Sequence, residues 1–167
     1  MPKNDIINDP NIELIYTEIT RQYNVIRDSS NTLDNKSNGL MIFNGSFIAL
    51  VTTAFIQLII LLQNNHLSFS VLLIILPYIF LIGSFILLIK SFYVHLPSKN
   101  PRDFFKLLDK PTYELIGTIT ANIIDEMNHI EITLMLKSKY FRYSIISLFS
   151  GILTFALVFI YYINFYI

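Results

Sequence analysis

The chain has 167 residues, of which 53% are hydrophobic and only 14% are charged, against about 25% charged in an ordinary soluble domain. A soluble domain of this length has too high a surface-to-volume ratio to bury so much apolar side chain. The lack of cysteine excludes a disulfide scaffold, and high hydrophobicity with zero net charge excludes intrinsic disorder. The composition therefore indicates a small integral membrane protein.

The charged residues are confined to two segments of the chain. No Asp, Glu, Lys or Arg occurs between Lys36 and Lys90 or after Arg142. A membrane-spanning helix needs about 20 apolar residues, so the first charge-free stretch fits two spans and the second fits one. We therefore expect an all-α membrane protein with a hairpin of two spans and a third, carboxy-terminal span. The expected spans lie near residues 40–62, 67–89 and 143–165.

The positive-inside rule gives an orientation for these spans. All 12 Lys and Arg residues lie in 1–36 or 90–142, and two spans separate the two segments, so both lie on one side. That side is expected to be the cytoplasm, with the amino terminus inside, the carboxy terminus outside and the chain in the inner (plasma) membrane. The predicted organisation is a cytoplasmic amphipathic helix (1–39), a transmembrane hairpin (40–89), a cytoplasmic loop and long helix (90–142) and a third transmembrane helix (143–167).

Apolar stripes run along both predicted cytoplasmic helices. The first helix is expected to begin near Asn11 and to run into the membrane, with a candidate break at residues 28–31, whose side chains compete with the helical backbone. The second begins at Tyr113, and with no helix breaker before the third span it forms one helix of about fifty residues, about 75 Å long. The first stripe is Ile12, Ile19, Ile26, Leu33 and Leu40, and the second is Tyr113, Ile116, Thr120, Ile123, Met127, Ile130, Leu134 and Phe141.

The two stripes favour a homo-oligomer. Two narrow apolar stripes make a poor core by themselves, so packing against other subunits is favoured over a monomeric stalk of two helices.

The sequence carries no constellation typical of an enzyme or a metal site. Cysteine is lacking, and neither a GxSxG motif nor a Gly-rich phosphate loop is present. Glu126 and His129 form an E-x-x-H pair, but a di-iron bundle needs two such motifs. The predicted spans also lack the ionisable residues that coupled transporters use, which leaves a passive pore open.

The first span carries polar and small residues in a regular pattern. Gly45, Ala49, Thr53 and Gln57 follow one another at intervals of four on one ridge of the helix, and small residues at that spacing let helices approach closely. Asn44 and Thr52 have two interpretations: they hydrogen-bond neighbouring helices, or they line a water-filled path when several copies surround an axis. In the second case Ile48 forms an apolar ring that gates by dewetting.

The basic residues have two candidate roles, and Lys36 is a candidate for both. Those near the predicted membrane boundary are explained by orientation and anionic lipids: Lys36, Lys90, Lys137, Lys139 and Arg142. A phosphate-bearing ligand has six candidate contacts: Arg21, Arg27, Lys36, Lys99, Arg102 and Lys106. The zero net charge gives no reason to expect binding to duplex nucleic acid.

Two segments resemble small membrane effectors of bacterial anti-phage systems. Residues 33–40, with Asp34, Lys36, Ser37 and Leu40, resemble the pattern D-x-K-A/S-x-x-L-L that leads into the first span of transmembrane Pycsar effectors and SLATT-type proteins. Residues 137–142 are similar to the start, K-x-K-Y, of the K-x-K-Y-x-x-R/A pattern before the last span of the Pycsar group. SLATT-type proteins have two spans, so a third span favours the Pycsar-like group.

The resemblance implies an effector that oligomerises and opens a pore in the membrane of an infected cell or damages it. It further implies a nucleotide second messenger as ligand, a cyclic nucleotide or an oligonucleotide, made by a partner cyclase or nucleotidyltransferase. Two alternatives stay open at this point. One is a small membrane anchor that recruits a cytoplasmic partner, and the other is a holin-like lysis protein.

Overall fold

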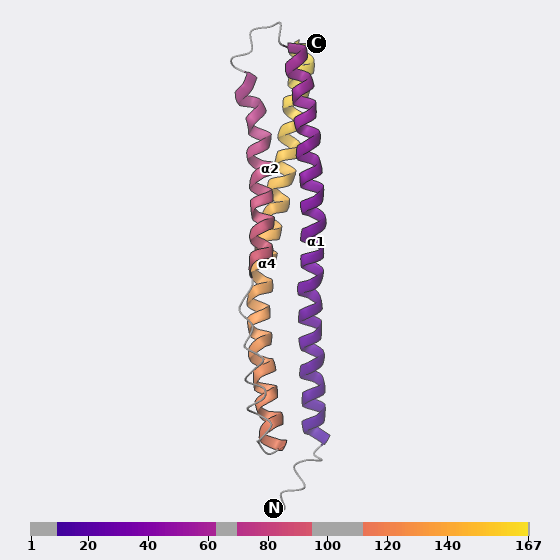
Figure 1. Cartoon of the computed structure of the whole chain (residues 1–167), viewed down its shortest axis with the longest axis vertical. Coiled ribbons are helices and arrows are strands. Elements are labelled where there is room, and N and C mark those ends of the chain that lie inside the picture. Colours follow the sequence, from indigo (N-terminus) through magenta and orange to yellow (C-terminus); the bar gives the residue numbers. More distant parts are fainter. Residues whose placement is uncertain (1–9, 63–69, 95–111, 167) are drawn as a thin grey trace, which may run out of the picture. The chain divides into compact units, whose positions relative to one another are not determined.

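Three long helices make up the described part of the chain. The computed structural model describes residues 10–62, 70–94 and 112–166, and in these ranges it contains no strand. The helices are α1 (Pro10–Leu62), α2 (Ser70–Tyr93) and α4 (Thr112–Tyr166) (Figure 1). Each is long and apolar enough to cross a membrane, which agrees with the expected all-α class and its three spans.

The two longest helices are uninterrupted. Proline suits the first position of a helix, where its missing N–H leaves no hydrogen bond unmade, and α1 begins at Pro10. The candidate break at residues 28–31 is wrong, because α1 continues through it and Ser29 Oγ donates to the carbonyl of Val25 within the same helix. The predicted long second helix is confirmed by α4, which has 55 residues.

The chain divides into two units. Unit 1 contains Met1–Thr32 and His95–Met135, and unit 2 contains Leu33–Val94 and Leu136–Ile167. In unit 1 the described parts of α1 and α4 are linked by Tyr23, whose hydroxyl donates to Glu126 Oε1 at 3.2 Å. Every side chain of the two apolar stripes that the structure describes is half-buried. The side chains of Ile12 and Tyr113 are not among those described.

Unit 2 is a bundle of three helices. Figure 1 shows α2 beside the second half of α1 and the second half of α4. α2 is antiparallel to α4, because Ser84 bonds to the carbonyl of Ser144 while Ser91, further along α2, bonds to the earlier carbonyl of Lys137. α1 and α4 are parallel, because contacts between them advance in the same direction along both helices. Asp34 of α1 contacts Lys137 of α4, and further along both helices Phe47 and Phe55 of α1 contact Phe155 of α4.

The buried side of each helix in unit 2 follows heptad spacing. Every seventh residue of α1 is buried at Ser37, Asn44, Val51 and Leu58, and every seventh residue of α4 is buried at Lys137, Ser144, Gly151 and Val158. On α2 the buried positions alternate in steps of three and four: Ile74, Pro77, Leu81, Ser84, Leu88 and Ser91. This repeat is typical of helices packed in a coiled-coil-like bundle.

The exterior of unit 2 is strongly apolar. Ile42, Phe149 and Leu153 are 65%, 66% and 62% exposed, and many other large apolar side chains on all three helices are also exposed. Polar side chains such as Ser37, Asn44 and Ser91 are fully buried instead. Water would penalise such an exterior, whereas a hydrocarbon environment suits it.

Candidate functional site

The buried polar side chains of unit 2 form two layers that draw on all three helices. The Lys137 layer contains Asp34 and Ser37 of α1, Ser91 of α2 and Lys137 of α4. The Asn44 layer contains Asn44 of α1, Ser84 of α2 and Ser144 of α4. The layers lie one heptad apart on each helix, so they stack along the bundle.

An ion pair dominates the Lys137 layer. Lys137 Nζ donates to both carboxylate oxygens of Asp34, at 2.9 and 2.8 Å, and the Lys137 and Asp34 side chains are 3% and 29% exposed. Ser91 Oγ donates to the backbone carbonyl of Lys137 at 3.3 Å. A buried ammonium group is tolerated only when it is paired, so this contact ties α4 to α1. The assignment of Lys137 to anionic lipid headgroups is therefore wrong.

Hydrogen bonds between helices organise the Asn44 layer. Asn44 Nδ2 donates to the carbonyl of Leu81 at 3.1 Å, and Ser84 Oγ donates to the carbonyl of Ser144 at 2.8 Å. One turn further along α4, Ser147 Oγ donates to the carbonyl of Phe80 at 2.7 Å. Such bonds give helices a specific contact where burial of apolar surface gives no driving force, as in a membrane.

Two atoms of these layers are buried without a partner. Ser37 and Asn44 are both 0% exposed, yet within the described part of the chain neither Ser37 Oγ nor Asn44 Oδ1 has a hydrogen-bond partner. Buried polar atoms in native proteins are bonded to protein or to ordered water in the great majority of cases. These two atoms are exceptions among the buried polar side chains of unit 2.

Beyond the two polar layers, the interior of unit 2 is apolar. Its core residues there are Val51, Phe55, Leu58, Ile74, Val158 and Tyr162. Thr52 contributes a polar contact at the edge of this region, accepting a hydrogen bond of 3.0 Å from the Tyr78 hydroxyl and donating one of 2.7 Å to the carbonyl of Ile48. Fully buried polar side chains are thus confined to one half of unit 2, where on α2 they alternate with the buried Leu81 and Leu88.

The predicted pore-lining residues lie toward the inside of a single chain. Asn44 is fully buried, Ile48 is half-buried and packs against the core, and Thr52 is half-buried and bonded to Tyr78. The bond from Asn44 to Leu81 is the helix-to-helix hydrogen bond of the first interpretation. A path that these three residues line between copies stays a prediction.

The predicted packing residues of the first span lie on its outer side. Gly45, Ala49, Thr53 and Gln57 are all exposed in the single chain, and a Cβ placed on Gly45 would meet nothing within 4 Å. They do not pack inside the bundle, and their contact with another copy stays a prediction.

The predicted nucleotide contacts are divided between the units. Arg21 and Arg27 belong to unit 1 and Lys36 to unit 2, and all three side chains are exposed. Lys99, Arg102 and Lys106 lie outside the described residues.

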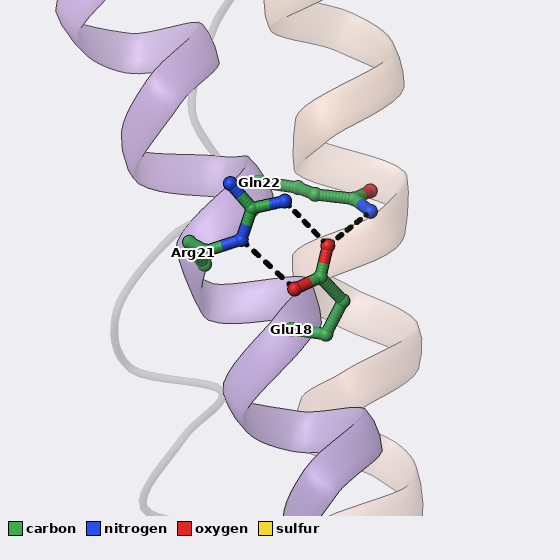
Figure 2. Close-up of polar contacts among 3 residues, drawn as sticks. All are labelled: Glu18, Arg21 and Gln22. Carbon is green, nitrogen blue, oxygen red and sulfur yellow. Dashed lines mark hydrogen bonds and ion pairs between the residues drawn. The ribbon is translucent and has the colours of Figure 1, made fainter.

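Arg21 is already paired within α1. Figure 2 shows the Glu18 carboxylate between Arg21 and Gln22, accepting bonds of 2.8 and 2.7 Å from the guanidinium and one of 2.9 Å from the amide. These hydrogen bonds, Arg21 first, lower the pKa of Glu18 from 4.5 to about 2. A phosphate ligand at Arg21 therefore competes with a charged carboxylate.

Arg27 lies near the contact between α1 and α4 in unit 1. Burial and the nearby Glu126 carboxylate raise the pKa of Tyr23, and Arg27 opposes that shift through its charge and a hydrogen bond. Tyr23 thus has both Glu126 and Arg27 as polar neighbours. No motif or stripe in the sequence points to Tyr23.

The Asp34–Lys137 pair and the serine contacts of α2 were also missed from the sequence. A signal was present: the second apolar stripe steps from Leu134 to Phe141, and Lys137 occupies the omitted position between them. A lone lysine at a seam position of an otherwise apolar stripe calls for a buried acidic partner.

Comparisons with known proteins give no further assignment. No protein-family model, no curated protein and no solved structure matches this chain.

Proposed function

We propose that the chain is a multi-pass protein of the bacterial inner membrane, with its amino terminus and residues 90–142 in the cytoplasm. The apolar exterior of unit 2 supports the membrane location. α1 and α4 are parallel, and α2, which lies between them in the sequence, is antiparallel to α4. This arrangement supports a topology in which the charged segments 1–36 and 90–142 are on the same side of the membrane.

We propose further that it is an anti-phage effector that oligomerises and opens an ion path when a nucleotide signal binds. One observation carries this proposal: a bundle with no charged residue in its spans keeps polar side chains inside, in the Asn44 layer, and apolar side chains outside. A conduction path needs a polar interior, whereas coupled transport needs ionisable groups in the spans.

The nucleotide acts through differential affinity for the closed and open assemblies. Arg21, Arg27 and Lys36 are exposed cations within the described residues, and each is a candidate contact for a phosphate-bearing ligand. Because Glu18 already neutralises Arg21, phosphate binding at Arg21 displaces Glu18 from the guanidinium. A partner cyclase or nucleotidyltransferase supplies the ligand.

Ion flux from liposomes tests the proposal. The purified oligomer is reconstituted and challenged with cyclic nucleotides and short oligonucleotides. We expect flux with one of these ligands, and a severalfold reduction for Asn44→Leu, with Ile42→Leu on the lipid-facing side as the matched control. Lack of flux with every nucleotide, from a correctly assembled oligomer, would refute the proposal.

A second candidate function is a membrane anchor that recruits a soluble partner. The observation in its favour is the exposure of large apolar side chains in unit 1, among them Leu14, Ile15 and Val25. This function predicts no conductance and no effect of Asn44→Leu. The holin-like alternative predicts toxicity on expression without any nucleotide.

A further inference from the structure

The polar side chains inside unit 2 are segregated along the bundle. Those that are fully buried belong to the Lys137 and Asn44 layers, whereas the following heptad position of α1 is Val51 and the next is Leu58. If the buried polar side chains served only to link the helices, similar side chains would also be expected at the heptad positions after Asn44. The arrangement instead divides the interior into a half that contains buried polar side chains, here called the polar half, and a half whose buried side chains are apolar.

The polar half contains more hydrogen-bonding capacity than the protein itself uses. Ser37 Oγ and Asn44 Oδ1 are 0% exposed and without partners in the described residues. The Lys137 ammonium group has three N–H donors, and the Asp34 carboxylate accepts two of them. A water molecule is the smallest ligand that supplies both donors and acceptors to such groups.

The polar half is connected to solvent through Asp34. Its side chain is 29% exposed while its carboxylate contacts the buried Lys137 ammonium, so one end of the cluster reaches the surface. Ser37 follows one turn later on α1, and Asn44 lies about 10 Å further along the helix axis. Val51 and Phe55, 0% and 2% exposed, then close the interior with apolar side chains.

We propose that this region is a water-binding inlet inside each chain, which begins at Asp34, binds internal water at Ser37 Oγ and Asn44 Oδ1, and ends at Val51. The inlet belongs to one chain and needs neither an oligomer nor a nucleotide. It confines the dry part of the bundle, which is the barrier to ions, to the half beyond Asn44. This last point rests on the proposed function: where the ion path follows the interior of the bundle, the polar layers form its hydrated half and Val51 begins its dry half.

Water-edited solid-state NMR of the unaltered protein in liposomes with deuterated lipids tests this inlet. Magnetisation starts on water protons, and its build-up is read at the carbon atoms of each side chain. We expect Ser37 and Asn44 to build up as fast as the partly exposed Asp34, and severalfold faster than Val51. Ser150 is the matched control for Ser37, because its hydroxyl bonds to the carbonyl of Ile146 in its own helix, 3.0 Å away, on an exposed face.

Build-up at Ser37 and Asn44 as slow as at Val51 and Ser150 would overturn the inlet. Fast build-up of water magnetisation at Val51 would also overturn the proposed inlet, because the apolar half of the interior would then contain water as well. Both outcomes are independent of ion flux: a protein that conducts nothing under any nucleotide can still contain the inlet, and a dry interior leaves a path between copies untouched.

Discussion

Lys137 of α4 donates two hydrogen bonds to Asp34 of α1, at 2.9 and 2.8 Å, and its side chain is 3% exposed. Both residues lie within three positions of the boundary where unit 2 begins, at Leu33 on α1 and Leu136 on α4. The pair therefore anchors the first polar layer of unit 2. In a bundle whose buried positions repeat every seven residues, a single charged pair also distinguishes the native register of α1 and α4 from a slip by one heptad.

The two partners are expected to differ in their mutational cost. Asp34→Asn leaves a buried ammonium without its counterion and should lower the free energy of unfolding by about 3 kcal/mol. Lys137→Met should cost less, because the carboxylate of Asp34, 29% exposed, can turn to solvent. SDS titration in mixed micelles measures both, and the double variant Asp34→Leu/Lys137→Met should recover most of the loss. Equal costs for the two single variants would contradict this asymmetry.

Gly151 is expected to tolerate no side chain. A Cβ at this position would lie 2.8 Å from Leu81 Cδ2 and 2.9 Å from its Cγ, and Leu81 is fully buried. Gly151→Ala should therefore destabilise the bundle by about 1–3 kcal/mol through overpacking. Gly45→Ala is the matched control, since nothing lies within 4 Å there and alanine favours the helix. The same unfolding titration measures both, and an unchanged Gly151→Ala variant would mean that α2 and α4 are less closely packed.

The serine contacts of α2 should each contribute a modest amount. Ser84→Ala removes the 2.8 Å bond to the carbonyl of Ser144 and should cost about 0.6 kcal/mol, the average for hydrogen bonds between membrane helices. Ser150→Ala removes a bond within α4 alone and should leave the contact between α2 and α4 unaffected. Disulfide trapping between cysteines introduced on α2 and α4 gives an independent measure of that contact.

Glu18 is expected to stay ionised to unusually low pH. Arg21 and Gln22 lower its pKa from 4.5 to about 2, so the contact stabilises the helix above pH 4.5 and is lost as the pH falls toward 2. Carbon-13 NMR titration of the Glu18 carboxyl measures the shift directly. Arg21→Ala should return the pKa toward 4.5, whereas Arg27→Ala should leave it low. A midpoint near 4.5 in the unaltered protein would show that the contact does not form in solution.

A polar substitution at the end of the inlet is expected to weaken the barrier to ions. Val51→Asn places an amide in the apolar half, next to Phe55, and should raise the passive leak of protons and small cations from liposomes severalfold over the unaltered protein without nucleotide. Leu50→Asn introduces the same amide on the exterior, where the native side chain is 57% exposed, and should not raise the leak. Equal leak from both variants would indicate general disruption of the bilayer.

The sequence alone was sufficient for three apolar helices, although its candidate break at residues 28–31 does not occur in α1. Charge-free apolar stretches between Lys36 and Lys90 and after Arg142 predicted three spans, and helices of the required length and hydropathy occur there. The long second helix was predictable because no proline or glycine pair interrupts residues 113–165. These properties depend on local composition, because an apolar segment of sufficient length satisfies its backbone hydrogen bonds within its own helix.

Which face of each helix turns inward was decided only by the tertiary structure. The predicted stripe through Leu33 and Leu40 is half-buried, whereas the fully buried positions of α1 begin at Ser37 and Asn44, which apolar periodicity cannot select. Where the surroundings are as apolar as the core, hydrophobicity no longer separates inside from outside. The choice then depends on pairwise contacts such as Asp34 with Lys137 and Asn44 with Leu81, between residues far apart in the chain.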